Sequence, residues 1–243
     1  MTDNSIRAYD LPQRIAGYDA DMDVMHPNRR KMVEIAVQMT TFTPPRRITI
    51  LDLGIGTGFF SWRFLQHFPN AEVIAVDGAA SMIEAAKERL GVLKDRVDFR
   101  VGDFRDIETL LKPDEGLDLV ISAYALHHLD GHDKARVLSS LVTRLRPGGQ
   151  LINADLIIAT HPLIEERFQQ LRAEGCVKRA PHDDQRFADV AATRTFLSEL
   201  EKAEGDQPLT LLEDLAILKA AGLAGADVFW LETREAVTGG VKA

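Results

Sequence analysis

Three closely spaced glycines, Gly54, Gly56 and Gly58, follow the apolar run 50–53. Glycine carries no side chain, so it lets the backbone turn sharply and approach a bulky ligand closely. The segment that follows is expected to begin a helix, and the first N–H groups of a helix have no partner within it. The spacing therefore favours a turn that binds the amino-acid end of a nucleotide-like ligand.

A carboxylate stands at a second position that could bind the same ligand. The next apolar run ends at Asp77, one predicted helix further along the chain. At the end of such a strand a carboxylate can accept hydrogen bonds from both hydroxyls of an unmodified ribose. The two features together indicate a cofactor that contains a ribose.

These residues must be positioned by an alternating series of strands and helices. Runs that are apolar along their whole length are typical of parallel strands buried on both faces by helices. The expected strands are 48–53, 72–77, 97–101, 117–122, 150–158, 227–232 and 235–241. The expected helices are 28–42, 59–67, 80–90, 107–111, 133–145 and 209–221, with a charged helical insertion at about 161–206 that is expected to lie over the sheet. A tight turn is expected at Arg146–Gly149 before the fifth strand, because proline cannot continue a helix.

In this order the motifs of residues 46–158 resemble those of class I S-adenosylmethionine-dependent methyltransferases of the small-molecule type. The resemblance implies an α/β fold: a Rossmann-like seven-stranded, mostly parallel sheet with helices on both faces, an antiparallel last strand and a helical cap. It also implies S-adenosyl-L-methionine as the cofactor. One departure is Ala79, where relatives often have serine, so one polar contact to the cofactor is expected to be missing.

The resemblance also implies roles for individual residues in the cofactor site. Met82 and Asp103 also fit a second interpretation, in which they only fill the core and end a turn. The residues expected to hold the methionine portion are Asp52, Gly54, Ile55, Gly56 and Gly58, with Ser122 and Ala123 beside it. Those expected at the ribose and adenine are Asp77, Gly78, Met82, Gly102, Asp103 and Phe104, and Tyr18 completes the set.

Three other functions use similar sequence patterns. A nicotinamide-dependent dehydrogenase needs a third glycine where this chain has Phe59, which would crowd the packing of helix on strand. A protein that binds the cofactor without catalysis fits the cofactor motifs equally well. A carboxy-S-adenosylmethionine synthase is the third, because residues 15–18 carry a short similarity to that enzyme.

Methyl transfer from a sulfonium is a direct displacement, so the protein must mainly align the acceptor and exclude water. If the acceptor must lose a proton, a histidine is the side chain best matched to neutral pH. His127, His128 and Tyr124 are the catalytic candidates, although a paired histidine here can equally serve packing and hydrogen bonding. No metal is expected, because Asn153 and Asp155 do not form the adjacent carboxylate–amide cluster of magnesium-dependent relatives.

The acceptor is expected to be a small molecule methylated on oxygen or nitrogen. The chain has 29 basic and 37 acidic residues and a net charge of −8, which disfavours nucleic acid and anionic membranes as partners. Residues 122–125 also lack the Asn/Asp-Pro-Pro-aromatic turn of enzymes that methylate nucleic-acid amino groups. The polar cap residues expected to reach an acceptor are Tyr9, Tyr18, His26, His161, Arg172, Arg186 and Arg194. The cations Arg186 and Arg194 would suit an anionic acceptor, although their spacing equally fits one exposed helix face.

A chain of 243 residues can form one core, so a single domain is expected. Its parts would be an N-terminal helical cap (1–42), a cofactor-binding core (46–158), a helical cap insertion (160–208) and a closing helix with strands (209–243). Cys176 is the only cysteine, which excludes an intramolecular disulfide and suits a reducing cytoplasm. No secretory signal or membrane span is expected, and a homodimer is possible.

Overall fold

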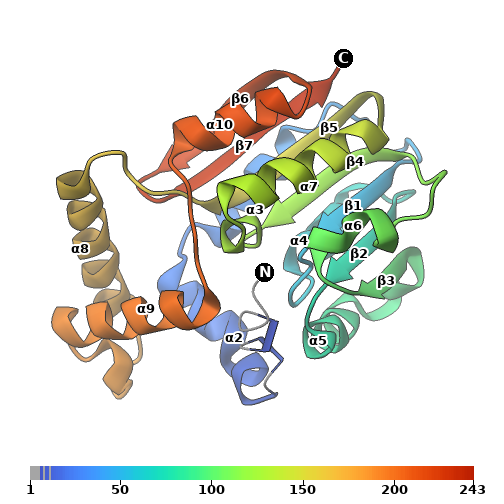
Figure 1. Ribbon diagram of the computed structural model, residues 1–243. Helices are drawn as coiled ribbons and strands as arrows, with labels where there is room; N and C mark the ends of the chain where they lie inside the picture. The colour runs from blue at the N-terminus through green and yellow to red at the C-terminus, as the bar shows by residue number, and fades with distance from the viewer. Residues whose placement is uncertain (1–5, 8, 11) are drawn as a thin grey trace.

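The computed structural model describes residues 6–7, 9–10 and 12–243 (Figure 1). Residues 1–5, 8 and 11, which belong to the expected N-terminal cap, lie outside the described residues. The centre of the structure is a seven-stranded sheet in the order β3-β2-β1-β4-β5-β7-β6. The strands are β1 Thr49–Leu53, β2 Glu72–Asp77, β3 Val97–Val101, β4 Leu117–Ala123, β5 Leu145–Leu156, β6 Leu223–Glu232 and β7 Glu235–Lys242. Strands β1 to β5 pair in parallel, and β7 runs antiparallel to both β5 and β6, as predicted.

Helices cover both faces of this sheet (Figure 1). The helices next to it are α3 Arg29–Gln38, α4 Phe59–His67, α5 Ala80–Leu90, α6 Ile107–Leu110, α7 Gly131–Arg144 and α10 Leu211–Ala220. Consecutive strand residues point to opposite faces, so Ile50 packs with α3, α4 and α5, while Leu51 packs with α6, α7 and α10. Within the described part of the chain, no helix has the length and apolar composition needed to cross a membrane.

Three helices lie beyond the carboxyl ends of the parallel strands (Figure 1). They are α2 Pro12–Met25, α8 Pro162–Arg179 and α9 Val190–Glu204. A separate small apolar cluster joins them, and it contains Met25 of α2, Cys176 of α8 and Leu197 of α9. The predicted insertion is therefore helical, but it packs on α2 at the end of the sheet and not over the sheet's face.

Other differences from the predicted elements are local. The expected helix 28–42 ends at Gln38, before Pro44 and Pro45, and helix α2 was expected only as part of the N-terminal helical cap, without bounds of its own. The expected turn at Arg146–Gly149 is a bulge within β5. In the pairing of β4 with β5, Leu117 is opposite Leu145 but Leu119 is opposite Gln150, so the intervening residues have no counterparts. Gly148 in this bulge has a φ of +75°, which explains the glycine.

Candidate active site

The glycine-rich turn lies at the carboxyl end of β1, against the end of β4. Gly54 has a φ of +78°, and a Cβ at this position would lie 2.5 Å from the Cβ of Ala125. Any side chain at residue 54 would therefore clash with its neighbour as well as strain the backbone. The backbone N–H of Gly56 donates to Asp77 Oδ2 at 2.8 Å, which fixes the turn to the end of β2.

Two buried carboxylates stand at the strand ends on this side of the sheet. Asp77 accepts a second backbone hydrogen bond from Ala79 at 2.9 Å, and burial raises its pKa to about 6. Asp52 accepts a hydrogen bond from the Ser61 hydroxyl at 2.5 Å, and burial raises its pKa to about 7. Both carboxylates line one cleft, so donors on a bound ligand can replace the water that burial has removed.

This cleft brings together most of the residues predicted for cofactor binding, and we refer to it as the cofactor cleft because of that prediction. Among them, the lining residues are Tyr18, Asp52, Gly54, Ile55, Gly56, Asp77, Met82, Phe104 and Ala123. The other predicted residues support the walls or lie beside them. Gly58 packs on Ala86, and the Ser122 hydroxyl donates to the backbone oxygen of Leu53.

Three predicted cofactor residues have other neighbours in the structure. Gly78 lies against Ile6, and Gly102 lies against Leu110. The Asp103 carboxylate accepts from the backbone N–H and the guanidinium of Arg105, with distances of 2.5–3.0 Å. None of the three is among the residues that line the cleft, so their contacts with the cofactor stay predictions.

Arg29 is a cleft residue that the sequence did not reveal. Its guanidinium is buried beside the glycine-rich turn, where Nη2 lies 3.4 Å from the Thr57 hydroxyl. Its carbon atom Cζ lies 4.5 Å from the centre of the Phe59 ring, and Nη1 donates to Asp19 at 2.7 Å. The spacing of the apolar residues in α3 predicted a helix there but gave no signal that this arginine enters the cleft.

A second cavity of about 530 Å³ adjoins the cofactor cleft. Tyr9, Tyr18, Met22 and Tyr124 line both spaces, so the two are neighbours with shared walls. Helices α2, α8 and α9 supply most of the remaining walls. A cavity of this size accommodates a small molecule. We refer to it as the cap cavity.

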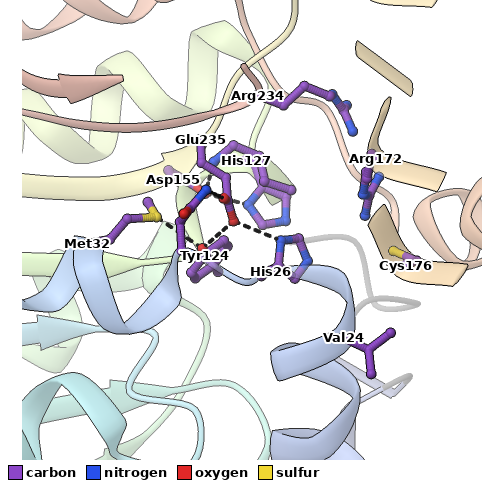
Figure 2. Close-up of polar contacts among 12 residues, drawn as sticks. Val24, His26, Met32, Tyr124, His127, Asp155, Arg172, Cys176, Arg234 and Glu235 are labelled. Carbon is purple, nitrogen blue, oxygen red and sulfur yellow. Dashed lines mark hydrogen bonds and ion pairs between the residues drawn. The ribbon is translucent and has the colours of Figure 1, made fainter. Parts of the chain in front are cut away.

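His127 lies at the wall of the cap cavity, held by a buried carboxylate (Figure 2). Its Nδ1 is 2.6 Å from Asp155 Oδ1, at the end of β5, and its Nε2 is 3.6 Å from Asp206 Oδ1. Burial lowers the pKa of His127, but the charges of Asp155 and then Asp206 outweigh it, so the net pKa is raised. Asp206 belongs to a loop that is fixed next to His127, because the Gln207 N–H donates to the His127 backbone oxygen at 2.7 Å.

His128 has a different environment from its neighbour. It lines the cofactor cleft, and its Nδ1 lies 3.0 Å from Asp206 Oδ1. Burial, followed by the charge of His127, lowers the pKa of His128, so the proton of the pair resides on His127. His127, His128 and Asp206 offer ligand atoms within 4.8 Å of one another, a spacing that a metal ion could use. The expected absence of a metal therefore stays a prediction.

Tyr124, the third catalytic candidate, donates a hydrogen bond from its hydroxyl to a carboxylate. The hydroxyl is 2.6 Å from Glu235 Oε1, and the backbone has a φ of +49°, in the left-handed region. Burial raises the pKa of Tyr124 well above its ordinary value, so the phenol stays protonated. The ring lines both cavities, and because the phenol is protonated its oxygen can accept a hydrogen bond but cannot take up a proton as a base.

The polar residues predicted for the caps divide into two groups. Tyr9, Tyr18, His26, Arg172 and Arg186 line the cap cavity. Arg194 pairs with Glu166 on the exposed surface, and the side chain of His161 caps the start of α8.

The chain is similar in sequence to known methyltransferases. Residues 50–149 match a protein family described as a methyltransferase domain. An uncharacterized methyltransferase of Anoxybacillus flavithermus is 30% identical over 54% of this chain and 58% of its own length. A malonyl-[acyl-carrier protein] O-methyltransferase of Priestia megaterium is 30% identical over 74% of this chain and 59% of its own length. The chain therefore spans less than two thirds of each of these relatives.

The fold also matches solved structures. Human N-acetylserotonin methyltransferase in complex with S-adenosylmethionine superimposes with a TM-score of 0.59 and 18% sequence identity. The match covers 95% of this chain and 56% of the human enzyme. At this identity the likeness concerns the fold, and the glycine-rich turn of the present chain lies inside the matched family region of residues 50–149.

Proposed function

We propose that this chain is a class I S-adenosylmethionine-dependent methyltransferase and that it methylates a small molecule bound in the cap cavity. The observation that carries the proposal is the position of the His127–Asp155 pair. It lies at the wall of the cap cavity, which adjoins the cofactor cleft. A proton acceptor is thus placed next to the space where a methyl donor would bind.

The residues of the cofactor cleft fit S-adenosylmethionine. Asp77 is buried at the end of β2 with a carboxylate that can accept from the two ribose hydroxyls. Arg29 lies next to the glycine-rich turn and shares the Asp19 carboxylate with Arg89, so a net positive charge remains to bind the carboxylate of the methionine portion. Met82 and Phe104 supply apolar walls for the adenine ring.

When bound, the cofactor supplies a methyl group on a positively charged sulfur. The protein's own part is to align the acceptor, exclude water and take up a proton. Asp155 orients His127 through Nδ1, so Nε2 is the nitrogen that accepts a proton from the acceptor. The imidazolium that forms lies between Asp155 and Asp206, whose charges stabilise it.

The size and lining of the cap cavity favour a small molecule as the acceptor. The Priestia relative is named for a malonyl group on a carrier protein, so a carrier-bound acyl group is the second acceptor to test. The cavity is lined by paired charges and aromatic rings, which suits a free small molecule of mixed polarity. Methylation on oxygen is favoured, because a hydroxyl must lose a proton and His127 lies at the cavity wall, where it can accept that proton.

A screen with methyl-labelled S-adenosylmethionine tests this function. The acceptors would be small alcohols, phenols, amines, thiols and carboxylic acids, together with malonyl-carrier protein. We expect label in at least one small hydroxy compound. Label only in the carrier protein would contradict the proposed acceptor. No labelled product with any compound, despite cofactor binding, would favour a binding protein, and a co-purified carboxylated cofactor would favour the synthase.

A further inference from the structure

Two histidines of the cap cavity are held in the same way, each by a buried carboxylate at Nδ1 (Figure 2). His127 Nδ1 lies 2.6 Å from Asp155, and His26 Nδ1 lies 3.3 Å from Glu235 Oε1. His26 comes from the turn between α2 and α3, more than a hundred residues before Glu235 at the start of β7. The fold therefore brings two separately built imidazole–carboxylate pairs to the wall of one cavity.

The partners of Glu235 determine which nitrogen of His26 is free. Glu235 also accepts from the Tyr124 hydroxyl at 2.6 Å and from Asn28 Nδ2 at 2.8 Å. Burial opposes its ionisation, but these contacts outweigh burial and lower the pKa of Glu235. An ionised carboxylate can only accept, so His26 must carry its proton on Nδ1. Nε2 of His26 is then left as an acceptor.

The charges that face His26 keep this imidazole neutral. Burial lowers its pKa, and the positive charges of Arg172 on α8 and of His127 lower it further, although Glu235 opposes them. Figure 2 shows Arg172 across from the two imidazoles. Nε2 of His26 is therefore a hydrogen-bond acceptor at neutral pH, and it suits an O–H or N–H group of a ligand.

The arginines that line the cavity already have carboxylate partners. Arg14 pairs with Glu204, and Arg172 pairs with Glu201. Arg186 makes two hydrogen bonds of 2.7–2.8 Å to Asp21. Their charges are compensated, so the cavity does not favour an anionic acceptor over a neutral one. The apolar part of the lining is Met22, Met25, Leu156, Phe196 and Leu200.

We propose that the cap cavity binds a neutral acceptor that carries two neighbouring hydroxyl groups on an apolar ring or chain. This inference rests on the proposed function. One hydroxyl donates to His26 Nε2, which orients the molecule, and the other faces His127. The oxygen of that second hydroxyl bonds to the transferred methyl carbon as the sulfur–methyl bond breaks. The bonding pair stays on sulfur, and the hydroxyl proton passes to His127 Nε2.

Matched pairs of probes test this inference. Calorimetry of the protein saturated with S-adenosylhomocysteine would compare 1,2-dihydroxybenzene with phenol, and 1,2-cyclohexanediol with cyclohexanol; benzoate serves as the anion. We expect at least one diol to bind about tenfold more tightly than its partner, the effect of one hydrogen bond. Equal binding within both pairs, or a preference for benzoate, would overturn the proposal.

Variants of His26 separate a binding role from a structural one. In His26→Leu the preference for the diol should disappear, while the affinity for the monohydroxy compound and for the cofactor stays unchanged. His26→Gln should restore part of the preference, because its amide oxygen can take the place of Nε2. His182→Leu, an exposed histidine on a loop, is the control. A preference for the diol that persists in His26→Leu would contradict the role of His26. A preference for the diol without any methylated product would contradict the proposed function but not the role of His26 in binding.

Discussion

The imidazole Nδ1 of His127 lies 2.6 Å from Oδ1 of Asp155, although 28 residues separate them in the sequence. The contact joins the short helix η3 (Leu126–His128), just after β4, to the carboxyl end of β5, where Asp155 is the next-to-last residue. Because β4 and β5 are neighbours in the sheet, their carboxyl ends bring the two side chains together. The parallel order of the sheet thus creates an oriented base next to the cofactor cleft.

Replacing Asp77 with alanine should weaken the binding of S-adenosylmethionine about 100-fold, because both ribose hydroxyls lose a charged acceptor. Burial raises the pKa of Asp77 to about 6, so its carboxylate is ionised above that pH and protonated below it. Cofactor affinity in the wild type should therefore fall as the pH drops below 6. Calorimetry at several pH values measures both effects. The control is Asp98→Ala, because Asp98 is an exposed carboxylate that pairs with Arg100. An unchanged affinity in Asp77→Ala would contradict the assignment of Asp77 to the ribose.

Arg29→Met should weaken the binding of S-adenosylmethionine about tenfold or more, because the methionine carboxylate loses its cation. Methylthioadenosine, which lacks that carboxylate, should bind both proteins equally. Arg30→Met is the matched control, since Arg30 is exposed and pairs with Asp23. If Arg29→Met weakened both ligands to the same extent, the arginine would support the cleft without contacting the carboxylate.

The methylation rate should rise with pH through a pKa above 6.5, the ordinary value for histidine. His127 must be unprotonated to accept a proton, and the charges of Asp155 and Asp206 raise its pKa. Asp206→Asn removes one of these charges, so the rise should move to lower pH. The measurement is kcat/KM across pH 5 to 9 in the wild type, in Asp206→Asn and in the exposed Asp183→Asn. A profile that does not move in Asp206→Asn would exclude His127 as the titrating group.

Removing divalent metals should leave the methylation rate unchanged. His127 is engaged by Asp155, and a proton on its imidazole can balance the carboxylates on either side. Dialysis against a chelator, followed by assay with and without added Mg²⁺ or Zn²⁺, checks this. A loss of activity that a metal restores would instead identify His127, His128 and Asp206 as ligands.

The strands, most of the helices next to them and the glycine-rich turn were predictable from the sequence because their signals are local. The run Thr49–Leu53 is apolar enough to be buried on both faces, and the glycines at 54 and 56 have the positive φ that a turn requires. The sequence predicts a turn at Arg146–Gly149 where the structure has a bulge, because the same proline and glycines serve both structures and only the pairing with β4 distinguishes them.

The surroundings of the histidines were not predictable in the same way. Asp206 and Glu235 approach His127 and His26 from loops and strands far along the chain, so no spacing in the sequence relates them. Arg29 was not predicted because it lies on α3, where the apolar residues already explain why the helix is buried. The two arginines at 186 and 194 were predicted to suit an anion, but each is paired with a carboxylate.

Single-turnover methylation by His127→Ala shows whether His127 accepts the proton of the acceptor. The protein would be preloaded with S-adenosylmethionine and mixed with the hydroxy acceptor found in the labelled screen. We expect a rate about 100-fold or more below the wild type, the usual loss of a positioned base, with unchanged cofactor affinity. His132→Ala, whose side chain is 87% exposed, should keep the wild-type rate. A wild-type rate in His127→Ala would contradict the claim that this histidine accepts the acceptor's proton.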